Sequence, residues 1–446
     1  MLTNKTIKVP VLFYLTTSYF AGTMSFSQNY PTDILQESAV LQEISLEDLL
    51  NIEVEVATKT SEKSSLSPAI MTVITAQDIY DFGYNTVAEA MNHVAGFVDN
   101  FDLAMHNFGV RGVNSSVRSG SRTIKFMLDG QAIAFRSTSQ NFIDLELVPM
   151  GLIKRIEIIR GPASALYGAN AFLAVVNVVT LKGEDLALGE GSVAISANVI
   201  ESAGSGQHLD AFYGSQKTNW QYTIAGKMGS EDREGINLPR ISPAYNRVEN
   251  VQSGKDESKP LNFYSNVSYQ WDNSSKVNVR AYYQQLNVDN TFTDINPLKS
   301  AGVTTIGLEN LFLRADYEFN IFDNILSKVF AVYSHGGTLD KDRIELGAEN
   351  FFFDRRFGFE ALEFGGEFYI PLGGSDSLLV GADTKYEKHK IETFSRIDRL
   401  SDEKTALNLP RNETVKNTGA YFQYLKQISE HWRAIAGLRV DDDSLL

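Results

Sequence analysis

Residues able to perform covalent chemistry are sparse in this chain of 446 residues. There is no cysteine, which excludes thiol nucleophiles, disulfide scaffolds and zinc sites built from cysteine. The six histidines are scattered, and the motifs H-E-x-x-H, G-x-S-x-G and the phosphate-binding P-loop do not occur. We therefore predict that the protein is not an enzyme and has no catalytic residue, cofactor or metal site.

Charge and composition narrow the class of protein further. The formal net charge is −15 and no run of Lys and Arg occurs, so we expect no nucleic-acid partner. Hydrophobic residues make up 43% of the chain and charged residues 21%, a balance that favours a packed structure over a disordered one.

The N-terminal residues 1–27 have the pattern of an export signal peptide. Two lysines precede a mostly apolar stretch at 9–22, and small residues before position 28 would admit cleavage. The alternative is a single buried strand or helix. Residues 28–51 form a polar linker. No other apolar run reaches the about 20 residues of a membrane helix. A membrane-bound form would therefore have to be a β-barrel.

The elements expected in 52–183 are short and of mixed α/β type. The sequence IEVEVA at 52–57 alternates apolar and acidic residues, as a strand does. Two capping boxes predict short helices, one from Thr75 to Gly83 and one from Thr86 to Gly96. We expect these elements to form one small domain.

The stretch RIEIIRGPASALYGANAFLAVVNVVT, at 155–180, predicts a strand, one helical turn and a second strand. Gly161 ends the first strand, Pro162 takes the first helical position, and Gly168 ends the helical turn. Asp129–Gly130 lies between two β-rich runs and predicts the turn of a hairpin.

Residues 190–446 read as antiparallel β-strands. In LNFYSNVSYQW, at 261–271, apolar residues fall mainly on one face and Asn, Ser and Gln on the other. About eleven such strands follow one another in hairpins with short turns. Long polar segments near 229–259, 287–307, 335–356 and 389–412 separate the hairpins.

This pattern of short turns, long loops and strands of about ten residues is typical of an outer-membrane barrel. A soluble β-sandwich also alternates and is the alternative.

The motifs of the first domain are similar to those of a known family. The stretch 155–180, preceded in order by VITAQDI, VRGV and MLDG, resembles the plug domain of TonB-dependent outer-membrane receptors. The resemblance covers nearly all of 52–183. It implies a mainly β fold, with a small α/β plug inside an antiparallel transmembrane β-barrel. The plug motif residues would be Arg111, Gly112, Asp129, Gly130, Arg160, Gly161, Pro162, Tyr167 and Gly168.

The resemblance also implies a partner and a place for it. The segment 52–57 would be the TonB box, which a TonB-type energy-transducing periplasmic protein grips by strand addition. Its residues are Ile52, Glu53, Val54, Glu55, Val56 and Ala57. The alternative is an ordinary edge strand of the plug sheet.

Charged residues of the two regions are candidates for buried ion pairs between plug and barrel. The arginines are Arg111, Arg118, Arg122, Arg136 and Arg160. The carboxylates on polar strand faces are Glu318, Glu363, Glu367 and Asp383. Such pairs would hold the plug in place or form part of a switch that couples pulling on the TonB box to plug movement.

The family implies an outer-membrane active transporter and receptor for a scarce small-molecule solute in a Gram-negative bacterium, in contact with outer-membrane lipid. A ferric siderophore is the leading ligand, and cobalamin, haem, another metal or a carbohydrate remain open. His106, in the loop LAMHNFG, is a weak candidate for a ligand contact, against a solvated loop histidine.

The expected strand count raises one difficulty for a transporter. Eleven strands are half of the about 22 that a barrel around a plug needs. We therefore expect residues 190–446 to form a partial barrel, the N-terminal half. A truncated receptor fragment without transport activity is an alternative, and a soluble periplasmic β-rich protein is another.

Overall fold

The structure is a computed structural model. The predicted signal peptide at 1–27 and linker at 28–51 lie outside the residues that it describes. It describes residues 53–54, 62–63, 70–101, 105–113, 122–161, 163–168, 170–186, 190–200, 204–232, 257–272, 275–290, 304–322, 325–345, 351–398, 400–407, 412–429 and 432–445.

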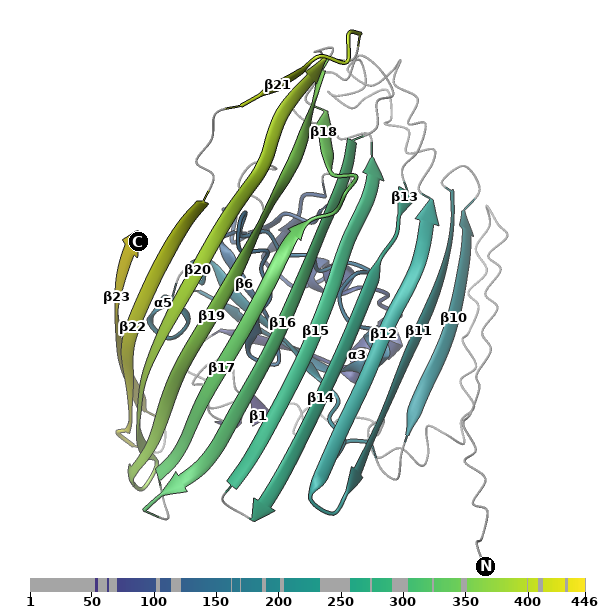
Figure 1. Cartoon of the computed structure of the whole chain (residues 1–446). Coiled ribbons are helices and arrows are strands. Elements are labelled where there is room, and N and C mark those ends of the chain that lie inside the picture. The colour runs from purple at the N-terminus through teal and green to yellow at the C-terminus, as the bar shows by residue number, and fades with distance from the viewer. Residues whose placement is uncertain are drawn as a thin grey trace, which may run out of the picture.

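The molecule has two regions, a small α/β domain and a large sheet of long strands (Figure 1). The small domain, here called the plug, lies against one face of the large sheet, here called the wall. Short turns join the wall strands at the lower end of Figure 1, and the longest strands rise at the upper end. The mainly β fold predicted from the sequence is therefore confirmed.

The plug is built on a five-stranded sheet with the order β3-β8-β9-β6-β7. Neighbouring strands are antiparallel except β6 and β9, which pair in parallel. The bounds are β3 Met71–Thr75, β6 Ile124–Leu128, β7 Gln131–Ala132, β8 Ile153–Arg160 and β9 Ala174–Thr180. β4 (Phe97–Asp99) and β5 (Phe108–Val110) form a separate antiparallel pair.

The central strand β9 explains the apolar run in the sequence. All seven of its residues are buried, because the plug core covers both faces of the strand. Ile156 and Ile158 of β8 and Val176 and Val178 of β9 belong to one apolar cluster that also includes residues of the two helices.

The helices of the plug are short. α3 (Ala76–Phe82) has the predicted capping box, in which Thr75 and Asp78 bond each other's backbone N–H, and it ends at Gly83 with φ 67°. A 3-10 turn, η2 (Met150–Leu152), precedes β8. None of the helices in the described ranges is long and apolar enough to cross a membrane.

Two helix boundaries differ from the prediction. α4 (Val87–Asn92) ends at His93 rather than at Gly96. The cause is local, because the amides of His93 and Val94 close tighter bonds to Ala90 and Met91. α5 (Ser164–Tyr167) begins after Ala163, later than the expected start at position 162, which lies outside the described residues.

The wall is a sheet of fourteen described strands. Three of them, β13 (Glu257–Ser258), β18 (Arg343–Glu345) and β21 (Lys404–Ala406), have two or three residues, which leaves the eleven long strands that the sequence predicts. The long strands are β10 Gly191–Ile200, β11 Gly204–Lys217, β12 Trp220–Asp232, β14 Leu261–Asp272, β15 Ser275–Asn290, β16 Thr304–Ile321, β17 Ile325–Thr338, β19 Phe351–Gly373, β20 Asp376–Asp398, β22 Asn412–Gln427 and β23 Arg433–Leu445.

The predicted hairpins are all present and antiparallel. Their closing pairs are Lys217 with Trp220, Asp272 with Ser275, Ile321 with Ile325, Gly373 with Asp376, and Gln427 with Arg433. The register is continuous through each hairpin, apart from bulges near Gln270, Arg356 and Pro371. The short turns at one end therefore follow directly from the sequence pattern.

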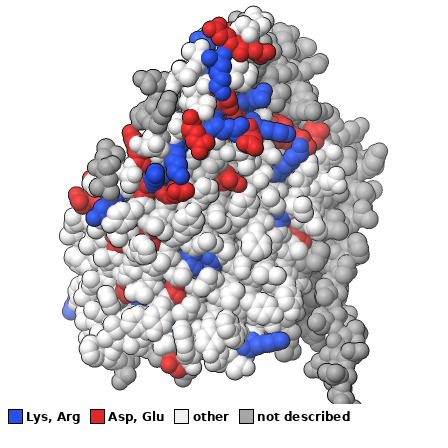
Figure 2. All heavy atoms as spheres, in the orientation of Figure 1, with Lys and Arg blue, Asp and Glu red and all other residues white. Residues whose placement is uncertain are grey.

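In the wall, polar side chains face inward and apolar side chains face outward, which is the reverse of a soluble protein. In β14 the polar residue Asn262 is 2% exposed, whereas Phe263 next to it is 49% exposed. Figure 2 shows that the outer face carries few charged side chains over most of its height and that charges gather at its upper end. An apolar outer face and a polar inner face are what an outer-membrane barrel requires.

Two segments predicted as long polar loops are largely strand. β19 and β20 have 23 residues each and pair as far as Phe351 with Asp398. The prediction of loops at 335–356 and 389–412 is therefore wrong for much of both segments. Aromatic contacts support the extension, because the Phe353 and Phe394 rings lie 5.5 Å apart and Arg396 lies over the ring of Phe351.

Candidate functional site

The best-defined polar site lies at the turn between β6 and β7, where the plug meets the wall. Asp129 and Gly130 both have positive φ, 47° and 76°, as the predicted hairpin turn requires. The Asp129 carboxylate accepts hydrogen bonds from the backbone N–H of Thr180 at 2.9 Å and from its hydroxyl at 3.0 Å. The hydroxyl of Tyr264, on β14 of the wall, donates to the same carboxylate at 2.7 Å.

A buried ion-pair network continues from this turn into the wall. Arg280 of β15 donates to the backbone carbonyl of Asp129 and pairs with Asp316 of β16 at 2.9 Å. Arg314 pairs with Asp316 at 2.7 Å and donates to the side chain of Gln131 at 2.9 Å. Arg280 is 8% exposed and Asp316 is 2% exposed.

The network is balanced in charge, which permits its burial. Arg280, Arg314 and Lys328 are its cations, and Asp129, Asp316 and Glu318 are its carboxylates, since Lys328 lies 3.8 Å from Asp316 and 3.1 Å from Glu318. Burial of an unpaired charge costs several kcal/mol, so each member depends on the others. We call Asp129, Tyr264, Arg280, Arg314 and Asp316 the turn clamp.

A second clamp holds the upper part of the plug. Arg136 pairs with Glu363 of β19 at 3.2 Å and with Glu387 of β20 at 3.4 Å, and donates to the Ser334 hydroxyl at 3.0 Å. The predicted ion pair between plug and wall is thus present for Arg136 and Glu363. Glu387 also pairs with Lys385 at 2.9 Å and with His389 at 2.7 Å.

The other arginines proposed as partners of the wall bind within the plug instead. Arg111 donates to the carbonyl of Arg160, Arg160 donates to the carbonyl of Ala95 and the hydroxyl of Thr72, and Arg122 donates to the carbonyl of Thr138. Backbone carbonyls close to each arginine satisfy these donors. Arg118 lies outside the described residues.

The remaining predicted carboxylates bind other wall residues. Glu318 pairs with Lys328 at 3.1 Å, and Asp383 pairs with Arg439 at 2.9 Å. Glu367 accepts a hydrogen bond from the hydroxyl of Tyr421. These three carboxylates are on the wall as expected, but among the described residues none of them forms an ion pair with Arg111, Arg122, Arg136 or Arg160.

The plug motif residues act mainly through the conformation and the hydrogen bonds of their backbone. Arg111, Gly112 and Gly161 have positive φ, as sharp turns require. The carbonyl of Tyr167 accepts a hydrogen bond from Lys125. Gly168 has φ 65°, and a Cβ built there would lie 3.2 Å from the Nε atom of Arg439 on β23. α5 therefore approaches the wall closely.

Apolar contacts complete the seat of the plug. Phe135 packs edge-to-face on Phe357 and Phe359 of β19, with ring centroids 5.9 and 5.4 Å away. Leu166 of α5 packs with Leu379 and Tyr421 of the wall. The plug thus contacts the inner face of the wall through polar clamps and through apolar clusters, the largest of which also includes Tyr282 and Phe312 of the wall.

His106 is held by carboxylates of the plug and is not a solvated loop residue. Its Nδ1 atom lies 2.6 Å from Asp99 and its Nε2 atom 3.5 Å from Asp144, and the ring stacks on Phe101 at 4.5 Å. Burial lowers the pKa of His106, but the carboxylates of Asp144 and Asp99 outweigh burial and raise the pKa to about 10. Burial and Asp144 also raise the pKa of Glu146 to about 7.

The predicted role of His106 as a ligand contact stays a prediction. Within the described ranges, no group of three or more His, Asp or Glu side chains is arranged to hold a metal ion.

The predicted TonB box is only partly described. β1 (Glu53–Val54) pairs antiparallel with β2 (Glu62–Lys63), and Val54 is fully buried. This pair is a separate two-stranded sheet, so β1 is not an edge strand of the plug sheet. Residues 52 and 55–57 lie outside the described residues.

Sequence reasoning missed most of the turn clamp. Tyr264, Arg280, Arg314 and Asp316 come from three wall strands and are 135 to 187 residues from Asp129 along the chain. One signal was available in the sequence, because Tyr264 is an aromatic residue on the polar face of β14. The spacing of the others gives no indication that they meet.

The fold and the clamps define a plug seated on the inner face of an outer-membrane barrel wall. Residues 63–175 match the model of the TonB-dependent Receptor Plug Domain. The first region of the chain is therefore a plug domain of the kind found in TonB-dependent receptors.

Curated relatives agree with this class. The chain is 24% identical over 348 residues to the vitamin B12 transporter BtuB of Vibrio vulnificus, a match that covers 75% of the chain and 50% of that protein. It is 32% identical over 150 residues to the iron-regulated outer membrane virulence protein of Vibrio cholerae, over 32% of the chain and 22% of that protein.

Solved structures share the fold. The siderophore receptor PirA from Acinetobacter baumannii aligns with a TM-score of 0.64 at 18% identity, over 85% of the chain and 57% of that structure. The ferripyoverdine receptor of Pseudomonas aeruginosa aligns with a TM-score of 0.62 at 16% identity, over 89% of the chain and 54% of that structure. The chain spans about half the length of these receptors and of the vitamin B12 transporter.

Proposed function

We propose that the protein is an outer-membrane active transporter of the TonB-dependent type and that its cargo is a ferric siderophore. The observation that carries this proposal is the turn clamp, which seats the plug on the polar inner face of the wall at Asp129. The reaction is transport, and no covalent bond is made or broken.

The chemistry of the clamps suits a plug that moves. Hydrogen bonds and ion pairs can be exchanged for bonds to water, whereas an apolar core cannot be opened without a large loss of free energy. Arg136 of the plug binds three wall side chains, and Asp129 of the plug is bound by Tyr264 and Arg280 of the wall, so a shift of the plug would release these contacts together. Interfaces that open are generally more polar than permanent ones.

We propose that the segment 52–57 is the handle for an energy-transducing periplasmic protein. In the described part of this segment, two residue pairs join β1 to β2, Glu53 with Lys63 and Val54 with Glu62. A ladder this short is weak, so the strand of a partner protein would readily replace β2 by strand addition.

The ligand proposal rests on the names of the relatives. An iron-regulated outer membrane protein is among the sequence relatives, and siderophore receptors share the fold. Cobalamin is the second candidate, because the match to a vitamin B12 transporter extends over 348 residues.

The test of transport is uptake of cargo by cells that depend on this protein, with iron-55 siderophores and cobalt-57 cobalamin offered separately. In Val54→Pro the backbone donor needed for strand addition is lost, so we expect cargo binding to persist and uptake to fall to background. Val54→Ile is the matched control and should take up cargo normally. Normal uptake by Val54→Pro would overturn the proposed handle, and no uptake of either cargo by the wild type would overturn the proposed function.

A further inference from the structure

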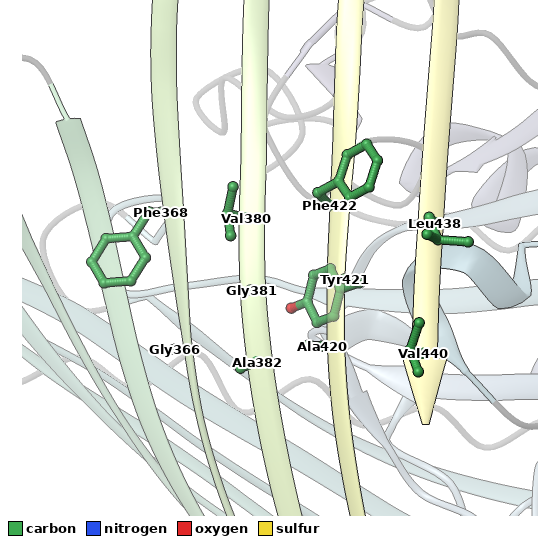
Figure 3. Close-up of a pocket in the computed structure, with 10 residues that line it drawn as sticks. All are labelled: Gly366, Phe368, Val380, Gly381, Ala382, Ala420, Tyr421, Phe422, Leu438 and Val440. Atoms are coloured by element: carbon green, nitrogen blue, oxygen red, sulfur yellow. The ribbon is translucent and has the colours of Figure 1, made fainter. Parts of the chain in front are cut away.

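The outer face of the wall has a groove between β19 and β23, and none of the residues that line it carries a charge (Figure 3). This groove therefore has no group that would respond to a change of pH near neutrality. A group of buried ionisable side chains lies on the inner face instead, where the plug meets β11, β12 and β15. Its centre is Glu146, a plug residue that is 4% exposed and belongs to neither clamp.

Glu146 lies in a turn that is packed between the plug and the wall. The turn comprises residues 144–148, here called the wedge. Leu147 of the wedge is 1% exposed and shares an apolar cluster with Tyr282 of β15. The side-chain amide of Asn262, on β14, donates a hydrogen bond to the carbonyl of Leu147. Movement of the wedge away from the wall would therefore bring Glu146 into water.

The ionisable groups that surround Glu146 come from both regions of the molecule. They are Asp99, His106 and Asp144 of the plug and His208, Asp210, Lys227 and Tyr282 of the wall. Two of these groups are cations, and both already have partners. The two carboxylates beside His106 share its imidazolium, and Lys227 pairs with Asp210 at 3.4 Å. Among the described residues, no Lys, Arg or His forms an ion pair with Glu146.

The lack of a cation affects the proton of Glu146. Burial, together with the charge of Asp144, raises the pKa of Glu146 from 4.5 to about 7. The seated wedge therefore keeps a proton that a wedge exposed to water gives up. Stability that depends on this proton is complete below pH 4.5 and is lost as the pH rises to about 7. The turn clamp differs, because cations match its carboxylates.

We propose that Glu146 is a positioning residue of the plug, which binds a proton as the wedge seats on the wall and releases it as the wedge leaves. The proton takes the place of the missing cation, because a neutral carboxyl is buried at a far lower cost than a carboxylate. The contact between plug and wall then has a part that responds to pH, the wedge, and a part held by ion pairs, the turn clamp. A rise in pH frees the wedge first.

The test is hydrogen exchange of the full chain in lipid vesicles, followed at the amide of Leu147 from pH 5 to pH 8. Division of each rate by the intrinsic exchange rate at that pH gives the equilibrium constant for opening of the wedge. We expect this constant to rise about tenfold per pH unit between pH 5 and pH 7, as the release of one proton requires. A constant that does not change over this range would overturn the proposal.

Variants of Glu146 separate proton binding from a merely structural role. Glu146→Gln keeps the shape of the side chain but cannot ionise, so its wedge should open nearly as often as that of the wild type at pH 5 and more than about tenfold less often at pH 8. Loss of a structural contact would instead increase opening at both pH values. Glu146→Asp keeps a carboxyl and should retain the rise with pH. Equal opening of the wild type and Glu146→Gln at pH 8 would contradict the assignment.

The matched control is Glu184→Gln. Glu184 is an exposed glutamate that follows β9, and its loss should leave the pH dependence of wedge opening as in the wild type. A pH dependence that disappears in this control as well would show that the response does not belong to Glu146.

A further comparison tests whether the wedge opens on its own. The Leu147 amide should exchange faster than the β9 amides, because the wedge leaves the wall while the plug sheet stays folded. Asn262→Ala removes the donor to the carbonyl of Leu147 and should increase opening about fivefold at each pH. Equal exchange at Leu147 and in β9, or no effect of Asn262→Ala, would overturn the wedge as a separate element. Neither cargo nor an energy source is present, so these results are independent of the uptake assay.

Discussion

The plug and the wall use the same residue types in opposite directions. In the plug, Ile158 and Val176 point inward and are fully buried. In the wall, Leu438 and Val440 point outward and are 55% and 64% exposed, while Asn262 and Gln284 point inward and are buried. The difference is the one expected if water and protein surround the plug and, as proposed, lipid surrounds the outer face of the wall.

This inversion decides what holds the two regions together. Because much of the inner face of the wall is polar, the plug binds it through the ion pairs and hydrogen bonds of Asp129 and Arg136 as well as through shared apolar clusters. Charged groups therefore contribute to the free energy that keeps the plug in place, alongside apolar contacts.

The largest effect is expected when the turn clamp is broken. Arg280→Met removes a buried guanidinium that pairs with the Asp316 carboxylate and donates to the backbone carbonyl of Asp129, and loss of one partner from a buried pair costs about 3–5 kcal/mol. Hydrogen exchange of the β9 amides should accelerate accordingly. The control Arg396→Met removes an exposed arginine and should cost less than about 1 kcal/mol. Equal protection in both variants would contradict the clamp.

A charge on the outer face is expected to have the next largest effect. Val279 is 49% exposed on the outside of β15, and Val279→Arg should cost about 2–4 kcal/mol if that face lies in lipid. All three tryptophans belong to the wall, so their fluorescence reports unfolding of the wall alone during urea titration in lipid vesicles. Val279→Ile should unfold like the wild type. If Val279→Arg leaves the free energy of unfolding unchanged, water rather than lipid covers this face.

The His106 cluster predicts a pH dependence confined to the plug. The pKa of His106 is raised from 6.5 to about 10, so its stabilising contribution is complete below pH 6.5 and is lost as the pH rises toward 10. His106→Gln should lower plug stability by about 1.5–3 kcal/mol at neutral pH and by much less near pH 10.

The wild type and His106→Gln are compared by hydrogen exchange of the plug amides at a series of pH values. The exchange rates give the free energy of opening of the plug. Glu146 also destabilises the plug as pH rises, between 4.5 and about 7, so the comparison is made above that window. A difference between wild type and variant that is constant with pH would show that His106 acts through packing alone.

The smallest effect is expected at exposed ion pairs of the wall. Lys404 is 50% exposed and pairs with Asp354 at 3.0 Å above the body of the wall. Lys404→Gln should change the free energy of unfolding by about 0–1 kcal/mol, because water screens the pair. A loss as large as that of Arg280→Met would mean that exposure does not separate the two kinds of ion pair.

Local patterns in the sequence predict the elements well because each element depends on its own residues. The alternation of apolar and polar residues in β14 and the turn at Asp129–Gly130 can each be recognised from a few consecutive residues. The two 23-residue strands were missed because the upper part of β20 is polar and the upper part of β19 does not alternate, and pairing as far as Phe351 with Asp398 keeps both extended.

Contacts between distant residues were predicted less well. Arg136 and Glu363 do meet, but Arg111 and Arg160 find backbone carbonyls within the plug. An arginine has five donors, and nothing in its spacing says whether a carboxylate or a carbonyl will accept them. Tyr264 and Arg280 join Asp129 only because the folded wall brings them there.

The central claim is that the plug must move relative to the wall for cargo to pass. A Cβ built on Gly437 of β23 would lie 3.8 Å from the Cβ of Ala165 in α5, a separation typical of disulfides. The chain has no other cysteine, so Ala165→Cys with Gly437→Cys gives one defined lock. Cargo uptake is measured in cells before and after oxidation. We predict that oxidation stops uptake, preserves cargo binding and is reversed by reduction. Uptake at the wild-type rate through a fully oxidised lock would contradict the account.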